Sequence, residues 1–107
     1  MPPGHDKSPA FHRFADFYPF YLGEHRNAVC RRLHFVGSWG VIALLAALVL
    51  TGNPWWLLAA VVCGYAFAWV GHFFFEKNRP ATFRHPIYSL MGDWVMFRDI
   101  CLGRIKL

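Results

Sequence analysis

Charged residues are scarce in this chain of 107 residues, and acidic ones are the scarcest, with 6 Asp and Glu against 11 Lys and Arg. Charged residues make up 16% of the sequence, whereas hydrophobic residues make up 56% and aromatic residues 19%. A soluble globule of this size needs more polar surface than that composition supplies. We therefore expect membrane-spanning segments, and the length allows a single domain, 1–107.

Cysteine is also rare, and its spacing excludes the usual frameworks. Cys30, Cys63 and Cys101 are odd in number and contain no CxxC pair, which argues against a disulfide scaffold or a zinc ribbon. We expect them to be small buried apolar residues. The sequence also lacks a Ser-His-Asp, Cys-His or phosphate-loop arrangement and any internal repeat.

In place of polar surface, the chain has two long uncharged segments, at about 34–51 and 54–75. Each falls within the roughly 17 to 25 residues that cross a bilayer as a helix. The intervening Thr51-Gly-Asn-Pro54 is typical of a turn, because Gly adopts positive φ and Pro begins a helix at its first position. The sequence therefore predicts an all-α integral membrane protein built on a hairpin of two spanning helices.

The segments outside the hairpin are predicted to lie at the membrane surface. Residues 1–9 are rich in Pro, Gly and charge, and we expect them to be disordered. Residues 10–22 carry Phe and Tyr at helical spacing with a bend at Pro19, and residues 87–102 are helical by period but too charged to span. These become N- and C-terminal interfacial helices, and Asn27 is the predicted N-cap of the first spanning helix.

Basic residues gather at one end of the predicted hairpin, whereas the tip carries no charge. They are Arg13, Arg26, Arg31, Arg32, Lys77, Arg79 and Arg84. The positive-inside bias places both termini in the cytoplasm, at the inner membrane of a bacterium or the endoplasmic reticulum of a eukaryote. Basic residues this close to a membrane edge are expected to contact lipid head groups, and no nucleic-acid partner is expected.

Two histidines fall at equal distances from the hairpin tip. His34 is 19 positions before Asn53 and His72 is 19 positions after it, so both lie about 28 Å from the tip at 1.5 Å per residue. His25 precedes His34 by nine residues, which would put the two on opposite faces of a continuous helix. A chain break at Asn27 leaves His25 in a loop that is free to fold back toward the pair.

Further candidates follow the second span. Glu76 lies four residues after His72, on the same helical face, and offers either an oxygen ligand or an acceptor for an imidazole N–H. His85 ranks below these four, and Asp93 and Asp99 are expected on the solvated side of the last helix. Alternatively, each histidine binds no metal and only forms a hydrogen bond with a neighbouring carbonyl or carboxylate.

Imidazoles with a carboxylate suit iron, zinc, copper or nickel, and such a set with open positions is typical of non-haem Fe(II) oxygen chemistry. A site at the lipid boundary favours a substrate with a polar head and an acyl tail. Two other classes remain open at this point. One is a haem protein with His34 and His72 as axial ligands, and the other is a non-catalytic lipid-binding hairpin.

Two segments, FYPFYLGEHRNAVCRRLHFVGSWG and AWVGHFFFEKNRPATFRHP, resemble the small membrane proteins of the Mpo1-like family. The resemblance covers Phe14 to about Met96 and is carried by the elements EH…LHxxG and GHxxxEKxxPA on either side of the hairpin. It implies an Fe(II)-dependent dioxygenase that uses O₂ to shorten a 2-hydroxy fatty acid by one carbon. The iron site that the resemblance implies consists of His25, His34, His72 and Glu76.

One position departs from the pattern, since Cys30 stands where we expect Asn in the family. Under the resemblance, the substrate carboxylate needs a cation, and the candidates are Arg26, Arg31, Arg32 and Arg79. Two spans make a small enclosure, so we also expect membrane lipids as partners and a homo-oligomer that completes the pocket.

Overall fold

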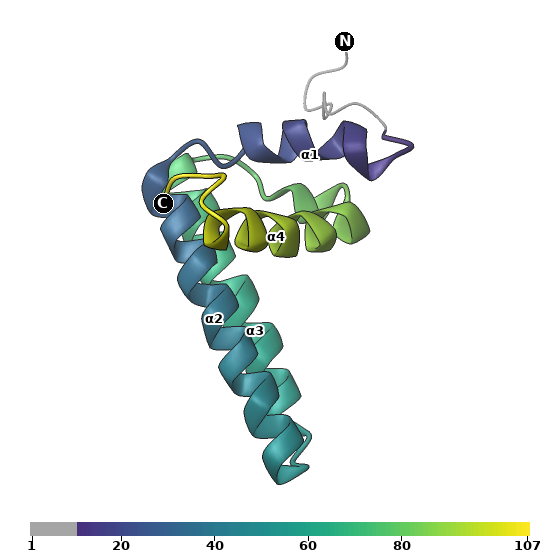
Figure 1. Ribbon diagram of the computed structural model, residues 1–107, viewed down its shortest axis with the longest axis vertical. Coiled ribbons are helices and arrows are strands. Elements are labelled where there is room, and N and C mark those ends of the chain that lie inside the picture. Colours follow the sequence, from purple (N-terminus) through teal and green to yellow (C-terminus); the bar gives the residue numbers. More distant parts are fainter. Residues whose placement is uncertain (1–10) are drawn as a thin grey trace.

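The structure, a computed structural model, describes residues 11–107, and every regular element there is helical (Figure 1). The four α-helices and two short segments are α1 (Phe14–Gly23), α2 (Ala28–Thr51), α3 (Trp55–Val70), η1 (Gly71–Glu76), η2 (Ala81–Phe83) and α4 (Pro86–Cys101). The all-α prediction is confirmed. The disorder predicted for residues 1–9 lies outside the described residues.

A long antiparallel hairpin of α2 and α3 forms the stem of the molecule (Figure 1). Gly52 ends α2 with φ 67°, a left-handed conformation that glycine adopts without a Cβ clash. The side chain of Asn53 then accepts a hydrogen bond from the backbone N–H of Trp55 at 3.0 Å, which starts the return helix. The turn predicted at 51–54 is therefore confirmed.

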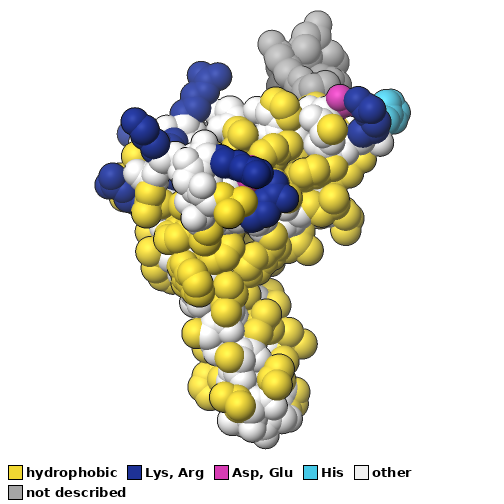
Figure 2. All heavy atoms as spheres, viewed as in Figure 1, with side chains coloured by type: hydrophobic (Ala, Val, Ile, Leu, Met, Phe, Trp, Pro, Cys, Tyr) yellow, Lys and Arg dark blue, Asp and Glu magenta, His cyan; other side chains and the backbone are white. Residues whose placement is uncertain are grey.

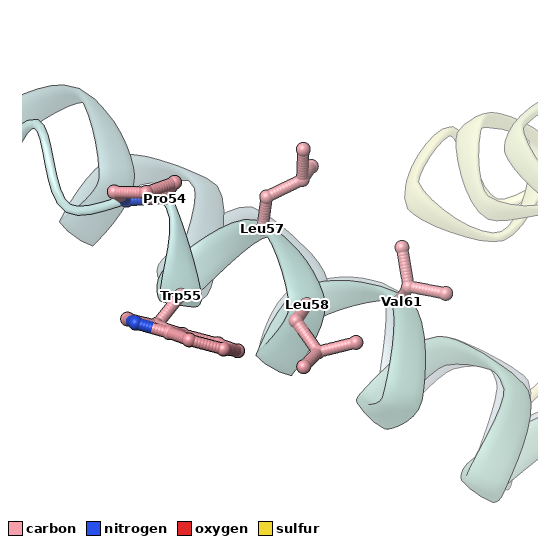
Figure 3. A pocket seen from close by; sticks show the side chains of 5 residues that line it. All are labelled: Pro54, Trp55, Leu57, Leu58 and Val61. Atoms are coloured by element: carbon pink, nitrogen blue, oxygen red, sulfur yellow. The ribbon is translucent and has the colours of Figure 1, made fainter.

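Two stretches of this hairpin are long and apolar enough to cross a membrane, Ala28–Thr51 and Trp55–Glu76. Only 11% and 17% of their most apolar windows are buried, whereas the core helix of a soluble protein is mostly buried. Figure 3 shows the side chains of Trp55, Leu57 and Leu58 projecting away from the start of α3, and Trp55 is 70% exposed. Such a surface requires an apolar surrounding, as a lipid bilayer provides.

Glycines let α2 and α3 approach each other closely. A Cβ atom added at Gly37 would lie 2.7 Å from the Cβ of Phe67, and one added at Gly40 would lie 2.9 Å from the Sγ of Cys63. Small residues serve the same purpose wherever spanning helices pack without a hydrophobic driving force. This close approach brings His34 on α2 and His72 beyond α3 within reach of each other.

Replacing Gly37 with Val should destabilise the hairpin, because the new side chain meets the rigid Cβ of Phe67 rather than a flexible end. Overpacking of this kind costs about 1–3 kcal/mol of unfolding free energy. The measurement is thermal unfolding in detergent, with Val36→Leu as the control, since Val36 is 53% exposed on the same helix. An unchanged melting temperature for Gly37→Val would mean that the helices do not pack at this distance.

Helices α1 and α4 lie across one end of the hairpin (Figure 1). They pack against each other around a small core of Phe17, Tyr21, Ala81, Met96 and Ile100. Pro19 lies inside α1, which continues through it as one helix. Figure 2 shows the Lys and Arg side chains gathered on this end, whereas the far half of the hairpin shows only apolar and uncharged groups.

Asn27 is the N-cap of α2, as predicted. Its side chain accepts hydrogen bonds from the backbone N–H groups of Val29 at 2.8 Å and Cys30 at 3.3 Å. This cap fixes the start of α2, so the preceding residues Glu24 to Arg26 form a loop between α1 and α2. His25 lies in that loop and is 1% exposed.

Candidate metal centre

Three histidines from three different segments meet where the hairpin joins α1. His25 comes from the loop after α1, His34 from α2 and His72 from η1. The ring centroids of His25 lie 4.5 Å from those of both His34 and His72, and the latter two are 5.1 Å apart. All three side chains are buried. The equal depth of His34 and His72 and the folding back of His25 are both confirmed.

Each imidazole uses its Nδ1 atom to bind an oxygen acceptor. The Nδ1 of His25 lies 2.7 Å from the Tyr21 carbonyl oxygen, and that of His34 lies 3.0 Å from the Cys30 carbonyl oxygen. The Nδ1 of His72 lies 2.7 Å from Oδ1 of Asn78. Because all three partners are acceptors, each Nδ1 must carry the hydrogen, which leaves a lone pair on each Nε2 atom.

The unprotonated nitrogens of His25 and His34 face each other. Their Nε2 atoms are 3.2 Å apart, and neither carries a hydrogen in this tautomer. Burial, and then the neighbouring imidazoles of His34 and His72, lower the pKa of His25 well below its usual range, so its ring stays neutral at pH 7. Two buried lone pairs at this distance repel each other unless a cation lies beside both.

A metal ion fits this arrangement. Metal–imidazole bonds are about 2.0–2.1 Å long, so two nitrogens about 100° apart around one ion lie about 3.2 Å from each other. This value equals the Nε2–Nε2 separation of His25 and His34. The buried group of His25, Cys30, His34 and His72 offers one donor atom each, all within 4.8 Å of one another. The described residues therefore contain a candidate metal centre built mainly from imidazole.

Cys30 is the member of this group that sequence analysis assigned only to packing. Its Sγ lies 3.8 Å from Nδ1 of His34, the side of the ring that faces away from the convergent Nε2 atoms. The same Sγ would lie 3.0 Å from a Cβ at Gly71, so Cys30 packs directly against the start of η1. Cys63 is half-buried and Cys101 is exposed, so burial is confirmed for Cys30 alone among the three thiols.

Asn78 holds His72 in place and was not identified from the sequence. Its side-chain amide donates to the Glu24 carbonyl at 3.1 Å, which directs Oδ1 toward His72. Its backbone N–H also donates to the His72 carbonyl at 3.0 Å. Lys77 makes this return possible with a left-handed φ of 59°. Asn78 therefore links the loop that carries His25 to the segment that carries His72.

Arg31 holds the same loop from the other side. Its Nη1 donates to the carbonyls of His25 at 3.0 Å and Arg26 at 2.7 Å. Its Nε donates to the carbonyl of Lys106 at 3.1 Å, which anchors the end of the chain beside the start of α2. The position of His25 is thus determined by its own hydrogen bonds to the end of α1 and by those that Asn78 and Arg31 donate to its loop.

A cavity of about 550 Å³ opens beside the histidines, between α2, α3 and α4. His34 and His72 line it at one end, and its walls continue along the hairpin to Leu45 and Leu57. The lining residues are mostly apolar, and the polar ones include Ser38, Tyr65, Thr82, Ser89 and Asp93. From His72 to Leu57 is fifteen residues, so the cavity follows about 22 Å of helix.

A family model described as 2-hydroxy-palmitic acid dioxygenase Mpo1-like matches residues 11–105, nearly the whole chain. The chain belongs to the Mpo1-like family. Comparison with curated proteins and with solved structures gave no match. The family's description names a dioxygenase, and the histidines that the sequence resemblance singled out are the three that converge in the structure.

Glu76 lies outside the convergent group of donor atoms. Its Oε2 accepts a hydrogen bond from the backbone N–H of Asn27 at 2.7 Å, at the start of α2. Sequence analysis placed Glu76 on the same face as His72 by assuming α-helical periodicity. The segment Gly71–Glu76 is instead a π-helix, in which four residues still make nearly one turn, so residue 76 stays near the face of residue 72. The hydrogen bond to Asn27 is what directs the Glu76 carboxylate to the start of α2.

Replacing Glu76 with Gln should leave the metal content unchanged, because the amide oxygen can still accept from Asn27 and the three imidazoles are untouched. Metal content by mass spectrometry is the measurement, with His72→Ala as the comparison that should lose metal. If Glu76→Gln lost metal to the same extent as His72→Ala, Glu76 would belong to the ligand set.

His85 does not join the other histidines. It lies among the rings of Phe11, Phe17 and Phe20, at centroid distances of 5.3, 5.4 and 6.2 Å. Its Nε2 is buried and has no hydrogen-bond partner among the described residues. A histidine at the start of a helix is ordinarily exposed, and contact with these rings explains why His85 is half-buried.

The prediction that Asp93 and Asp99 form a solvated face of α4 is wrong. Asp99 is 7% exposed and accepts a hydrogen bond from the Tyr18 hydroxyl at 2.7 Å, as well as bonds from Arg98. Asp93 accepts a hydrogen bond from the hydroxyl of Tyr21, which is fully buried. Helix α1 covers this face of α4, and its two tyrosines supply the donors that buried carboxylates need.

Burial raises the pKa of Asp93 to about 6, against the opposing effect of the Tyr21 hydrogen bond. The folded chain then holds the Asp93 proton more tightly than the unfolded chain does. Its stabilising contribution is complete below about pH 4 and is lost as the pH rises through about 6. We expect the melting temperature of Asp93→Asn, relative to the natural chain, to rise from pH 5 to pH 7.5. A difference that did not vary with pH would contradict this expectation.

The arginines proposed as carboxylate anchors do not line the cavity in the described part of the chain. Arg31 and Arg32 bind backbone carbonyls at the end of the chain, and the guanidinium of Arg79 lies over the ring of Phe83 at 5.2 Å. The charged or ionisable groups that do line the cavity are His34, His72 and Asp93, together with the weakly acidic Tyr65.

Proposed function

We propose that this protein is a membrane-embedded, iron-dependent oxygenase that shortens 2-hydroxy fatty acids by one carbon. One observation carries the proposal: three buried histidines, each with Nδ1 bound to an acceptor and Nε2 left as the potential ligand atom, gather at the polar end of a long apolar cavity. The family description, which names a 2-hydroxy-palmitic acid dioxygenase, supports the same reaction. Membership of the family fixes the fold and leaves the reaction itself to be tested.

The donor set suits the proposed iron. His25, His34 and His72 would hold the ion through Nε2, and three protein ligands leave positions free for oxygen and substrate. When bound, Fe(II) supplies the electrons that let triplet O₂ react with an organic acid. The chain keeps the three imidazoles in one tautomer through the Tyr21, Cys30 and Asn78 acceptors, which also raises their basicity.

The cavity suits an amphiphile with a long chain. Its histidine end is polar, whereas most of its lining along α2 and α3 is apolar, with Val41, Leu45, Leu57 and Val61 toward the far end. The acid group of a fatty acid would lie at the histidines and its chain would run along the hairpin. Because the lining is as apolar as the surrounding lipid, a long acyl chain could lie along it at little cost.

The position of the site relative to the membrane supports a lipid substrate. The basic side chains gather beside α1 and α4, at the end of the hairpin where the histidines lie (Figure 2). By the positive-inside bias this end faces the cytoplasm, with both termini on that side. The site would then lie near the head-group level, and the cavity would follow the hairpin into the hydrocarbon layer.

The proposed reaction balances without a further reductant: R–CH(OH)–COOH + O₂ → R–COOH + CO₂ + H₂O. The bond between carbons 1 and 2 breaks, carbon 2 becomes the new carboxyl carbon, and O₂ accepts all the electrons released. The mostly apolar residues that line the cavity would limit the water around the reacting carbons.

The geometry disfavours haem, which the sequence left open. A haem with His34 and His72 as axial ligands would need its flat ring to pass between them. The His25 ring lies 4.5 Å from both of these imidazoles and occupies that space. A single ion held by all three rings matches the arrangement better.

The test is to add 2-hydroxypalmitic acid and O₂ to detergent-purified protein reconstituted anaerobically with Fe(II). We expect a fifteen-carbon acid, CO₂ in equal amount, and no product from palmitic acid or from the His34→Ala variant. Consumption of O₂ without a shortened acid, or equal activity in His34→Ala, would overturn the proposal.

A further inference from the structure

Asp93 is the one carboxylate among the side chains that line the described cavity. It comes from α4, whereas the histidines that share the cavity, His34 and His72, come from α2 and from η1. The cavity is therefore bordered by imidazoles on the hairpin and by an acidic side chain on the crossing helix. The family pattern and the proposed iron site assign no role to this residue.

Tyr21 fixes the orientation of the Asp93 carboxylate. Its hydroxyl donates to Oδ1 of Asp93, and its ring is stacked on the His25 ring with centroids 4.1 Å apart. Gly92 permits this contact, because a Cβ at that position would lie 2.9 Å from the Tyr21 ring. The carboxylate is thus held in one orientation by the same tyrosine whose carbonyl orients His25.

The Tyr21 hydroxyl binds Oδ1 of Asp93. The other carboxylate oxygen, Oδ2, can therefore still accept a hydrogen bond from a ligand. A carboxylate accepts hydrogen bonds and donates none when ionised, so it selects a ligand that brings a hydroxyl donor. It also repels a second carboxylate. A 2-hydroxy acid in this cavity would therefore turn its hydroxyl toward Asp93 and its own carboxylate away from it.

We propose that Asp93 is the specificity-determining residue that recognises the 2-hydroxyl group of the substrate. This inference rests on the proposed function, because it assumes that a fatty acid occupies the cavity. Palmitic acid and 2-hydroxypalmitic acid have the same chain and carboxylate and differ only in the hydroxyl. A buried carboxylate left without its donor penalises the acid that lacks the hydroxyl.

Three neutral hydroxyl side chains of the cavity, Ser38, Thr82 and Ser89, are the competing candidates. Ser89 provides the sharpest control, because it is 5% exposed and precedes Asp93 by one turn of the same helix. A hydrogen bond to a charged acceptor is stronger than one between neutral groups. Asp93 should therefore account for most of the discrimination, and Ser89 for little.

The experiment measures the dissociation constants of both acids for the full chain in detergent, under anaerobic conditions so that no turnover occurs. Binding is followed by the fluorescence of Trp69 and Trp94, which line the cavity, with both acids corrected for partition into micelles. The proteins are the natural chain, Asp93→Ala and Ser89→Ala. Each is measured as purified and after chelator treatment, so that chelation of the hydroxyl by a metal is separated from recognition by Asp93.

We expect the natural chain to prefer 2-hydroxypalmitic acid by about tenfold or more in both states, the value of one hydrogen bond to a carboxylate. In chelator-treated protein, Asp93→Ala should lose that preference while binding palmitic acid at least as well, and Ser89→Ala should keep it. A misfolded variant would instead lose affinity for both acids, so that no ratio of the two dissociation constants could be determined. Folding is checked separately by circular dichroism.

Equal affinity of the natural chain for the two acids, an undiminished preference in Asp93→Ala, or its loss in Ser89→Ala would overturn the assignment. The outcome is distinguishable from failure of the proposed function. Preference for the hydroxy acid through Asp93, with no shortened product on exposure to O₂, would refute the reaction and leave the assignment standing. Binding of neither acid would refute both.

Discussion

Replacing His25, His34 or His72 with Ala should remove the metal from the purified protein. The natural chain is expected to hold about one ion, because the donor atoms of the group all lie within 4.8 Å of one another. Mutating a residue that only hydrogen-bonds to a metal ligand typically lowers metal affinity by roughly 10- to 100-fold. Removing the ligand itself should lower the metal affinity by more than that. The measurement is metal content by mass spectrometry after gel filtration in detergent.

Two histidines outside the site serve as matched controls for this prediction. His12 is exposed and His85 lies in the aromatic cluster of α1, so His12→Ala and His85→Ala should keep the metal. Circular dichroism of each variant separates loss of metal from loss of fold. Full metal content in all three site variants would show that these imidazoles do not bind the metal. The alternative considered from the sequence would then hold, in which each histidine only forms hydrogen bonds with its neighbours.

Replacing Asn78 with Ala should weaken metal binding by about 10- to 100-fold, the usual effect of losing the acceptor that orients a metal-bound histidine. The Nδ1 of His72 would lose its acceptor at 2.7 Å, and the Glu24 carbonyl in the loop that carries His25 would lose its donor, the Asn78 amide. The affinity is measured by competition with a chelator of known strength. Asn53→Ala, at the far tip of the hairpin, is the matched control and should bind metal as the natural chain does.

A conservative variant distinguishes orientation of His72 from general support of the fold. Asn78→Asp keeps an oxygen acceptor for His72 and loses the donor to Glu24. Metal affinity should be largely restored in Asn78→Asp if the acceptor is what matters. Equal loss in Asn78→Asp and Asn78→Ala would mean that Asn78 acts through the loop instead.

The meeting of His34 and His72 was predictable because it depends only on the number of residues between each histidine and the hairpin tip. His34 and His72 are equidistant from the tip of an antiparallel hairpin, so their equal depth follows from helix rise alone. His25 could be added because Asn27 is a recognisable helix cap. The boundaries of α2 and α4 and the turn at Gly52 follow equally local signals.

Other residues depend on tertiary contacts that no local pattern reveals. Glu76 was predicted as a ligand or an acceptor beside His72, and the structure shows its carboxylate bound to the backbone N–H of Asn27. Asp93 and Asp99 were placed in solvent because charged residues on an amphipathic helix usually face water. Only the packing of α1 over α4 shows that Tyr21 and Tyr18 bind them, with Asp99 buried and Asp93 half-buried.

Asn78 illustrates the same limit from the other direction. An asparagine before a proline-containing segment is typical of a helix end, and no sequence pattern indicates that its amide reaches both His72 and the carbonyl of Glu24. That role requires the left-handed turn at Lys77, a conformation that a lysine rarely adopts. Residues that support a metal ligand are positioned by such tertiary contacts and are the hardest to find from one sequence.

The central claim is that His25, His34 and His72 together bind one iron ion, and X-ray absorption at the iron edge tests it most directly. The account predicts nitrogen neighbours at about 2.0–2.2 Å with the outer-shell scattering of roughly three imidazole rings, reduced by one ring's contribution in any His variant that retains iron. A haem spectrum with four ring nitrogens, a shell without imidazole scattering, or no bound iron even after anaerobic addition of Fe(II) would contradict it.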